Sequence, residues 1–253
     1  MKNIIKINSK INNKNQQKNF ICVLLTIFLM NCFIVTVKAQ EERYFPPALG
    51  LTFAYKGGVN GFTNPLGRKN GIALNNIPDA GITTYLPLDF IYNLGMYIDL
   101  MYNTNTFLMK YNYDGIEKKY ANSDRMRFSY FSISPTFNHS GFNLGFNLGI
   151  PVSADWEGVI IANSKLNNLI EVRAGYSYPL YFDEVGRLNL FINASYALNG
   201  VYKNFVQDDP LKNTVPAYPP QIITNYYNPR PASIQIGVQF LFNLIRLPDE
   251  YYE

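Results

Sequence analysis

The last long apolar stretch of the chain, Ala232 to Leu244, alternates between apolar and polar residues with a period of two. Its apolar face comprises Ala232, Ile234, Ile236, Val238, Phe240, Phe242 and Leu244, and Leu241 is the one exception on the polar face. Successive side chains of a β-strand point to opposite faces, so this pattern predicts a strand and excludes an amphipathic helix. A soluble sheet would bury the apolar face, whereas a membrane barrel would turn it toward lipid.

Seven other stretches carry a similar alternation. We predict strands at Ala48–Lys56, Gly81–Phe90, Leu94–Tyr102, Arg125–Phe137, Phe142–Ile150, Leu166–Leu180 and Leu188–Leu198. The stretch that begins at Arg125 alternates less cleanly, which predicts a register shift or β-bulge near Ser132 to Pro135. In the stretch that begins at Leu188, Phe191 lies against the pattern.

The connections between these eight strands alternate between long and short. The long ones are Gly57–Ala80, Asn103–Asp124, Pro151–Lys165 and Gly200–Pro231, and the tight turns lie near Tyr92-Asn93, Asn138–Gly141 and Tyr181–Arg187. A barrel that crosses a membrane up and down places all its long loops on one side and its tight turns on the other. We therefore predict an all-β, eight-stranded antiparallel up-and-down transmembrane β-barrel. A soluble lipocalin-like barrel, with an apolar interior and a polar exterior, is the alternative.

The first 39 residues have the features of a cleavable signal peptide. A basic, Asn-rich segment is followed by an apolar run from Phe20 to Val37, and Val37-Lys38-Ala39 places small residues three positions and one position before a cut. An uncleaved anchor and lipidation at Cys32 are the alternatives. Residues 40–253 then form the barrel domain of an exported chain.

The charge of the chain does not indicate an anionic partner. The chain has 22 basic and 18 acidic residues, but six of the lysines lie in the leader, which leaves 16 basic residues and a net charge of −2. Both cysteines lie in the leader as well, and the chain has one histidine. A Cys/His zinc site is therefore excluded, and a nucleic-acid surface is not expected. We expect no cofactor.

Five charged residues are predicted to point into the barrel, and they are Lys56, Asp99, Arg127, Glu171 and Arg173. An eight-stranded barrel is just wide enough inside for side chains to fill it. An unpaired charge in such a space is costly, so these groups are expected to pair across the interior. The network would plug the barrel or, alternatively, gate a narrow ion path.

Two short motifs have a chemical and a structural interpretation. His139-Ser140 could begin a hydrolytic site, but no neighbouring carboxylate orients the imidazole, so a turn is the simpler interpretation. Gly141, Gly145 and Gly149 form a doubled G-x-x-x-G. On a strand these glycines share one face with the asparagines between them, which indicates a crowded barrel interior rather than helix pairing.

Several stretches resemble the small outer-membrane β-barrel family of Bacteroidetes-type bacteria, a porin-like group similar in architecture to the OmpA transmembrane domain. They are Lys38-Ala39-Gln40, Leu86-Pro87-Leu88 before Tyr92-Asn93, Tyr130-Phe131-Ser132-Ile133-Ser134-Pro135, and the glycine-spaced strand from Phe142. The resemblance covers about residues 48 to 244. Unlike OmpA, the chain has only Ile245 to Glu253 after the last strand, which leaves no room for a peptidoglycan-binding domain, and it lacks a terminal aromatic residue.

These patterns lead to a functional expectation. The chain is expected to be a monomeric, non-enzymatic protein of the cell outer membrane with a structural or adhesive role and four extracellular loops. Its expected partners are outer-membrane lipid, lipopolysaccharide and the barrel-assembly machinery. The alternatives are a narrow gated pore, a lipid-modifying enzyme that uses His139 and Ser140, and an accessory component of a secretion system.

Overall fold

The computed structural model describes residues 45–63, 68–89, 93–113, 116–117, 125–156, 158–208, 224–246 and 248, which belong to one compact unit, Tyr44–Glu253. The predicted signal peptide, residues 1–39, lies outside the described residues. Most of the described part is β-structure. It contains no helix that is both long and apolar enough to cross a membrane.

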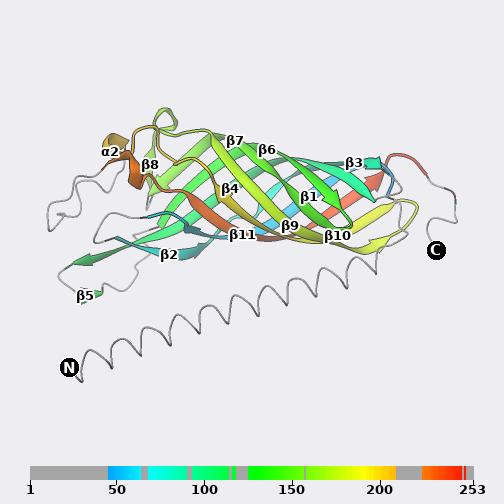
Figure 1. The fold of residues 1–253 in the computed structure, drawn as a ribbon, viewed down its shortest axis with the longest axis horizontal. Helices are drawn as coiled ribbons and strands as arrows, with labels where there is room; N and C mark the ends of the chain where they lie inside the picture. Colours follow the sequence, from blue (N-terminus) through cyan, green and yellow to red (C-terminus); the bar gives the residue numbers. More distant parts are fainter. Residues whose placement is uncertain are drawn as a thin grey trace, which may run out of the picture. The chain divides into compact units, whose positions relative to one another are not determined.

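Antiparallel strands pair in a closed ring of hydrogen bonds (Figure 1). In order around the ring they are β1 (Ala48–Asn60), β3 (Asp79–Asp89), β4 (Leu94–Tyr113), β6 (Arg125–His139), β7 (Phe142–Trp156), β9 (Leu169–Phe182), β10 (Gly186–Ala197) and β11 (Pro231–Asn243). The ring closes because β11 pairs with β1 along its whole length, from Ala48 opposite Asn243 to Asn60 opposite Pro231. Each predicted strand corresponds to one member of this ring.

Three short strands lie outside the predicted set. β2 (Arg68–Leu74) pairs with both β1 and β4, β5 (Ile116–Glu117) pairs with β4, and β8 (Val159–Ile161) pairs with β7. All three fall in connections that were predicted to be loops. They extend the sheet at the end where the long connections emerge, which we call the loop end. The opposite end, with the tight turns, is the turn end.

The two faces of the ring differ in polarity. On β7, Phe142, Leu144, Phe146, Leu148 and Ile150 are between 36% and 65% exposed, whereas Asn143 and Asn147 are at most 5% exposed. The apolar residues of β1 and β11 are exposed in the same way, and their polar partners are buried. The sheet is therefore inverted relative to a soluble barrel, with its apolar face outside and its polar face inside.

Two residues that broke the predicted alternation have specific places inside the ring. Leu241 is 1% exposed and packs in an apolar cluster at the turn end. Phe191 is buried opposite Gly237 of β11, and a Cβ on Gly237 would lie 2.6 Å from the Phe191 ring. The glycine makes room for the ring, a pairing in which an aromatic side chain covers a glycine on the neighbouring strand.

The predicted bulge near Ser132 to Pro135 is wrong in its position. β6 is continuous through these residues, and its register against β7 shifts instead between Ser129 and Tyr130. The pattern looked broken because Met126, Phe128 and Tyr130 are apolar residues on the inner face. They belong to a cluster that fills the loop end.

The turn between β9 and β10 is built around Asp183. Its Oδ1 accepts hydrogen bonds from the backbone N–H groups of Val185 and Gly186, both at 2.9 Å, and its Oδ2 accepts one from the Tyr181 hydroxyl at 2.8 Å. These bonds favour the charged carboxylate, so the pKa of Asp183 is lowered, chiefly by the Gly186 N–H and next by the Tyr181 hydroxyl.

We expect a carboxyl-carbon NMR titration of the folded protein to place the pKa of Asp183 below the ordinary aspartate value. Because the native pKa is depressed, the carboxylate stabilises the turn at neutral pH, and this contribution is lost as the pH falls through the native pKa. Tyr181→Phe should raise the pKa part of the way back. An Asp183 pKa at or above the ordinary value would contradict this account of the turn.

Candidate functional site in the interior of the ring

A network of polar side chains crosses the middle of the ring. Its charged members are Lys56, Asp79, Asp99, Glu171 and Arg173, all at most 4% exposed. We call this set the interior network. The inner faces of β1, β3, β4 and β9 carry these residues, because each lies on the polar side of its strand.

Asp79 and Lys56 form one half of the interior network. The Lys56 ammonium lies 3.2 Å from Asp79 Oδ2, which also accepts a hydrogen bond from Gln235 Nε2 at 2.9 Å. Oδ1 of Asp79 accepts from the backbone N–H of Thr104 at 2.9 Å. A buried carboxylate with several donors is well satisfied, so this ion pair also fixes the start of β3 against β4.

Two amide side chains hold Glu171, and no cation of the described residues forms an ion pair with it. Asn105 donates to its Oε1 at 2.8 Å, and Asn147 donates to its Oε2 at 2.7 Å. The same Asn105 side chain accepts a hydrogen bond from the Lys56 ammonium at 3.3 Å. A continuous chain of polar contacts therefore joins Asp79 on one wall to Glu171 on another.

Arg173 and Asp99 form the other half. Nη1 of Arg173 lies 3.0 Å from Oδ2 of Asp99, and the Thr83 hydroxyl donates to Oδ1 of Asp99 at 2.7 Å. Thr83 in turn contacts the Thr52 hydroxyl. These bonds connect β9 to β4, β3 and β1 across the interior.

Of the five residues predicted to point inward, four lie in the interior network, and Arg127 does not. The inner face of β6 carries Met126, Phe128 and Tyr130, so Arg127 points to the opposite side. There it pairs with Asp155, its register partner on β7, at 2.7 Å, with a side chain that is 38% exposed. The prediction for Arg127 is therefore corrected.

An apolar cluster closes the loop end of the ring. It joins inner-face residues of β4, β6 and β7 to residues from the connection after β10, including Val201, Tyr202 and Phe205, each at most 2% exposed. α2 (Phe205–Asp208) begins with one of them. The Phe128 ring stacks on Phe107 at 5.7 Å and meets Tyr202 edge-on at 5.8 Å. We call this cluster the loop-end cap.

Trp156, the only tryptophan of the chain, packs against the loop-end cap and can report on it. We expect Phe205→Leu to shift its fluorescence emission, because the smaller side chain loosens the packing of the cluster against which the indole lies. The free energy of unfolding should fall by about 1–3 kcal/mol, since a smaller apolar side chain replaces a fully buried ring. Phe45→Leu, at the turn end, is the control, and an equal emission shift in both variants would contradict this assignment.

A second cluster closes the turn end around Arg187. The Arg187 guanidinium lies 4.0 Å from the centroid of the Tyr85 ring and 4.4 Å from that of Phe45, with Tyr97 at 5.8 Å. Arg187 is 2% exposed, and none of its side-chain nitrogens has a hydrogen-bond partner in the described residues. Aromatic faces attract a cation through their quadrupoles, and this attraction offsets part of the cost of burial.

His139 and Ser140 lie at the turn between β6 and β7. Ser140 has a φ of 49°, and its backbone N–H donates to Asn93 O at 3.2 Å. His139 is exposed, and no carboxylate within the described residues bonds to its imidazole. The same part of the chain holds no group of three or more His, Cys, Asp or Glu side chains that could bind a metal ion.

Sequence reasoning missed Asp79 and Arg187, although both could have been found. Asp79 was assigned to a loop, yet it continues the inner-face alternation of Gly81 and Thr83. Arg187 was assigned to a turn, yet it precedes Asn189 and Phe191 on the inner face of β10. In both cases the strand was predicted to start too late by a few residues.

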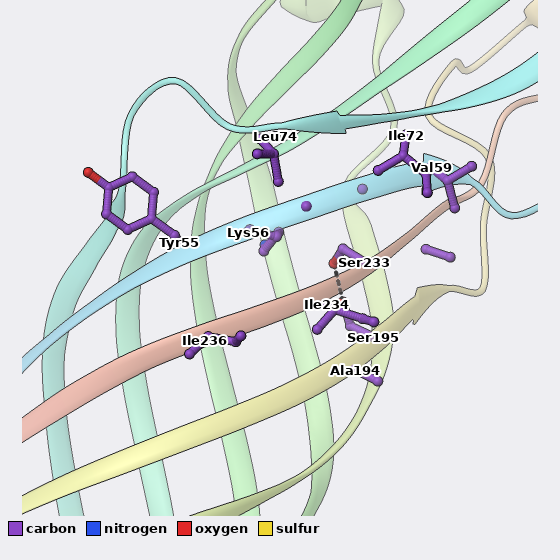
Figure 2. A pocket seen from close by; sticks show the side chains of 13 residues that line it. Tyr55, Lys56, Val59, Ile72, Leu74, Ala194, Ser195, Ser233, Ile234 and Ile236 are labelled. Atoms are coloured by element: carbon purple, nitrogen blue, oxygen red, sulfur yellow. Dashed lines mark hydrogen bonds between the residues drawn. The ribbon is translucent and has the colours of Figure 1, made fainter. Parts of the chain in front are cut away.

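On the outer wall, a groove runs between β2 and the strands β1, β11 and β10 (Figure 2). Its cavity volume is about 610 Å³. Ile72 and Leu74 of β2 lie on one side and Ile234 and Ile236 of β11 on the other, as Figure 2 shows. Lys56 lies on β1 beneath the groove, but its ammonium points inward to Asp79.

Comparisons with known proteins give no family for this chain. No protein-family model matches it, and no curated protein matches its sequence.

Proposed function

We propose that the chain is an eight-stranded β-barrel of the bacterial outer membrane with a closed interior and a structural or adhesive role. The observation that carries this proposal is the inversion of the sheet, in which a closed ring exposes its apolar face and buries its polar face. In water the exposed apolar face would cause the protein to aggregate, whereas in a bilayer the same face contacts the apolar lipid chains.

Strand length supports a membrane location. A strand tilted by about 45° needs roughly 9–11 residues to cross the hydrocarbon core. The members of the ring contain between 11 and 20 residues. A closed ring also leaves no unpaired strand edge, which a bilayer would not tolerate. Outer-membrane lipid and lipopolysaccharide are then the immediate partners, and the barrel-assembly machinery is the partner during insertion.

The filled interior favours a closed barrel over the rival of a gated pore. The interior network crosses the middle, the loop-end cap fills one end, and Phe45 with Arg187 fills the other. An ion would have to displace paired charges and two apolar clusters. The loop end, where the long connections emerge, would then carry the contacts with the surroundings of the cell.

The first experiment tests location and fold together. A producing strain is fractionated, and the outer-membrane fraction is run on a gel with and without boiling. We expect the protein in that fraction, with a mobility that changes on boiling, as folded outer-membrane barrels show. Recovery in the soluble fraction would contradict the proposal.

The second experiment tests the closed interior. Purified protein in planar lipid bilayers should give no discrete conductance steps, and regular steps would favour the pore instead. A strain without the protein then separates the two roles. Sensitivity to detergent would support a structural role, and impaired attachment with unchanged sensitivity would support an adhesive one.

A further inference from the structure

The groove on the outer face of the ring is lined by both small residues and large apolar ones. Small residues such as Gly57, Ala194 and Ala232 line it together with the large apolar side chains of Ile72, Leu74 and Ile234. The polar share of the lining is small, and the one bond drawn there joins the hydroxyls of Ser195 and Ser233 at 2.8 Å (Figure 2). The groove is therefore shaped for a hydrocarbon ligand rather than a polar one.

The groove forms because β2 pairs with β1 over only a short stretch and otherwise lies apart from it. β2 pairs with β1 only at Gly57 and Gly58, while its other pairings are with β4. Ile72 and Leu74 are 73% and 70% exposed, so their side chains stand over the outer wall instead of packing inside. A volume of about 610 Å³ falls within the range of about 300–1,000 Å³ that is usual for small-molecule sites.

The position of the groove indicates which lipid occupies it. It lies in the loop-end half of the ring, beside the last residues of β1 and the first of β11, and it continues the exposed apolar face of these strands. In the proposed topology the loop end faces the outside, so the groove opens into the outer leaflet. The lipid of that leaflet is lipopolysaccharide, whose lipid A part carries both acyl chains and phosphates.

Arg230 is a cation two residues before Ala232, which lines the groove, although Arg230 itself is not one of the lining residues. Arg230 directly precedes β11, and its neighbour Pro231 pairs with Asn60 at the end of β1. The Arg230 guanidinium lies 4.4 Å over the Phe62 ring, and in the described residues no carboxylate pairs with it. Its Nε is buried without a hydrogen-bond partner. Only Nε is buried in this way, so the other guanidinium nitrogens of this half-buried side chain are the donors for an anionic head group.

We propose that this groove binds one lipid A molecule, with an acyl chain lying between β2 and β11 and a phosphate contacting Arg230. The inference depends on the proposed outer-membrane location. It assigns to β2 the role of a clamp that holds one lipid against the wall.

The test uses the full mature barrel, purified in a mild detergent and incubated with lipid A that carries two phosphates. Native mass spectrometry counts the lipids that each protein retains. We expect one retained lipid A for the wild type and at least a fivefold loss of retention for Ala194→Trp, which places a large side chain in the groove lining. The matched control is Ala80→Trp, on β3 outside the groove, which should retain lipid A like the wild type.

The head-group contact is tested separately. Arg230→Gln should lower retention of lipid A with two phosphates, and it should leave retention of dephosphorylated lipid A unchanged. Arg246→Gln removes a cation at the turn end and should change neither. If Ala194→Trp and Ala80→Trp retained the same amount of lipid A, the proposed lipid site in the groove would be wrong. It would also be wrong if the wild type retained phosphatidylethanolamine as well as it retains lipid A.

The boiling-dependent gel is run first on every sample. If the wild type is not a folded outer-membrane barrel, the proposed function is wrong, and so is the proposal that the groove binds lipid A. If every variant is folded and in the outer membrane but none differs in lipid retention, the groove alone is overturned.

Discussion

Replacing Asp99 by Asn is expected to lower the free energy of unfolding by about 3–5 kcal/mol, because it leaves the Arg173 guanidinium buried without a counter-charge. Both side chains are at most 6% exposed, and their closest atoms are 3.0 Å apart. Urea unfolding of the protein in lipid vesicles, followed by Trp156 fluorescence, measures the change. Asn keeps the shape of Asp, so the loss reports the charge.

Two further variants separate the charge from the packing. Asp99→Leu combined with Arg173→Met removes both charges, and most of the lost stability should return, since an apolar pair of similar volume replaces the ion pair. Glu184→Gln breaks the exposed pair with Arg246 and should cost about 0–1 kcal/mol. A loss for Asp99→Asn as small as that for Glu184→Gln would mean that solvent reaches the interior.

Gly145→Ala is expected to lower the free energy of unfolding by about 3 kcal/mol or more, the upper part of the range for overpacking. A Cβ at Gly145 would lie 2.2 Å from the Pro135 carbonyl oxygen and 2.6 Å from the Thr136 Cα. Both are backbone atoms of β6, so relief requires the two strands to separate. The boiling-dependent gel shift and urea unfolding report the result.

Gly149→Ala is the matched control, on the same face of β7 four residues further along. Its Cβ would meet the Cβ atoms of Tyr130, Leu169 and Ser132 at 3.0–3.4 Å, and side chains can yield by that amount. We expect a cost of about 1 kcal/mol. Equal costs at Gly145 and Gly149 would show that β6 and β7 are less closely packed than the structure has them.

The strands could be predicted because alternation is a local property of the sequence. A residue such as Asn147 lies inside because its neighbours Phe146 and Leu148 lie outside, and no distant contact is needed to decide this. The same rule placed Lys56, Asp99, Glu171 and Arg173 on the inner face. It failed at Arg127, because in this part of β6 the apolar residues lie on the inner face and the charged residue lies on the outer face.

The cap and the groove could not be predicted, because they depend on contacts between distant segments. Tyr202 and Phe205 lie in a connection whose composition resembles a loop, and only the ring gives them a place to be buried. β2 likewise lies in a connection rich in Gly and Asn, and it forms a strand only by pairing with β1 and β4. Which cation pairs with which carboxylate also depends on the register of the whole sheet.

The pairing of the first and last strands has a consequence for biogenesis. Ala48 meets Asn243, so the ring cannot close until nearly all of the chain is present. Until then β1 and the most recently formed strand each present a free edge, and such edges invite pairing with other chains. Contacts this far apart in sequence also slow folding. A chaperone that shields both edges until the ring closes is therefore expected to affect the yield of folded protein more than any single contact in the completed barrel does.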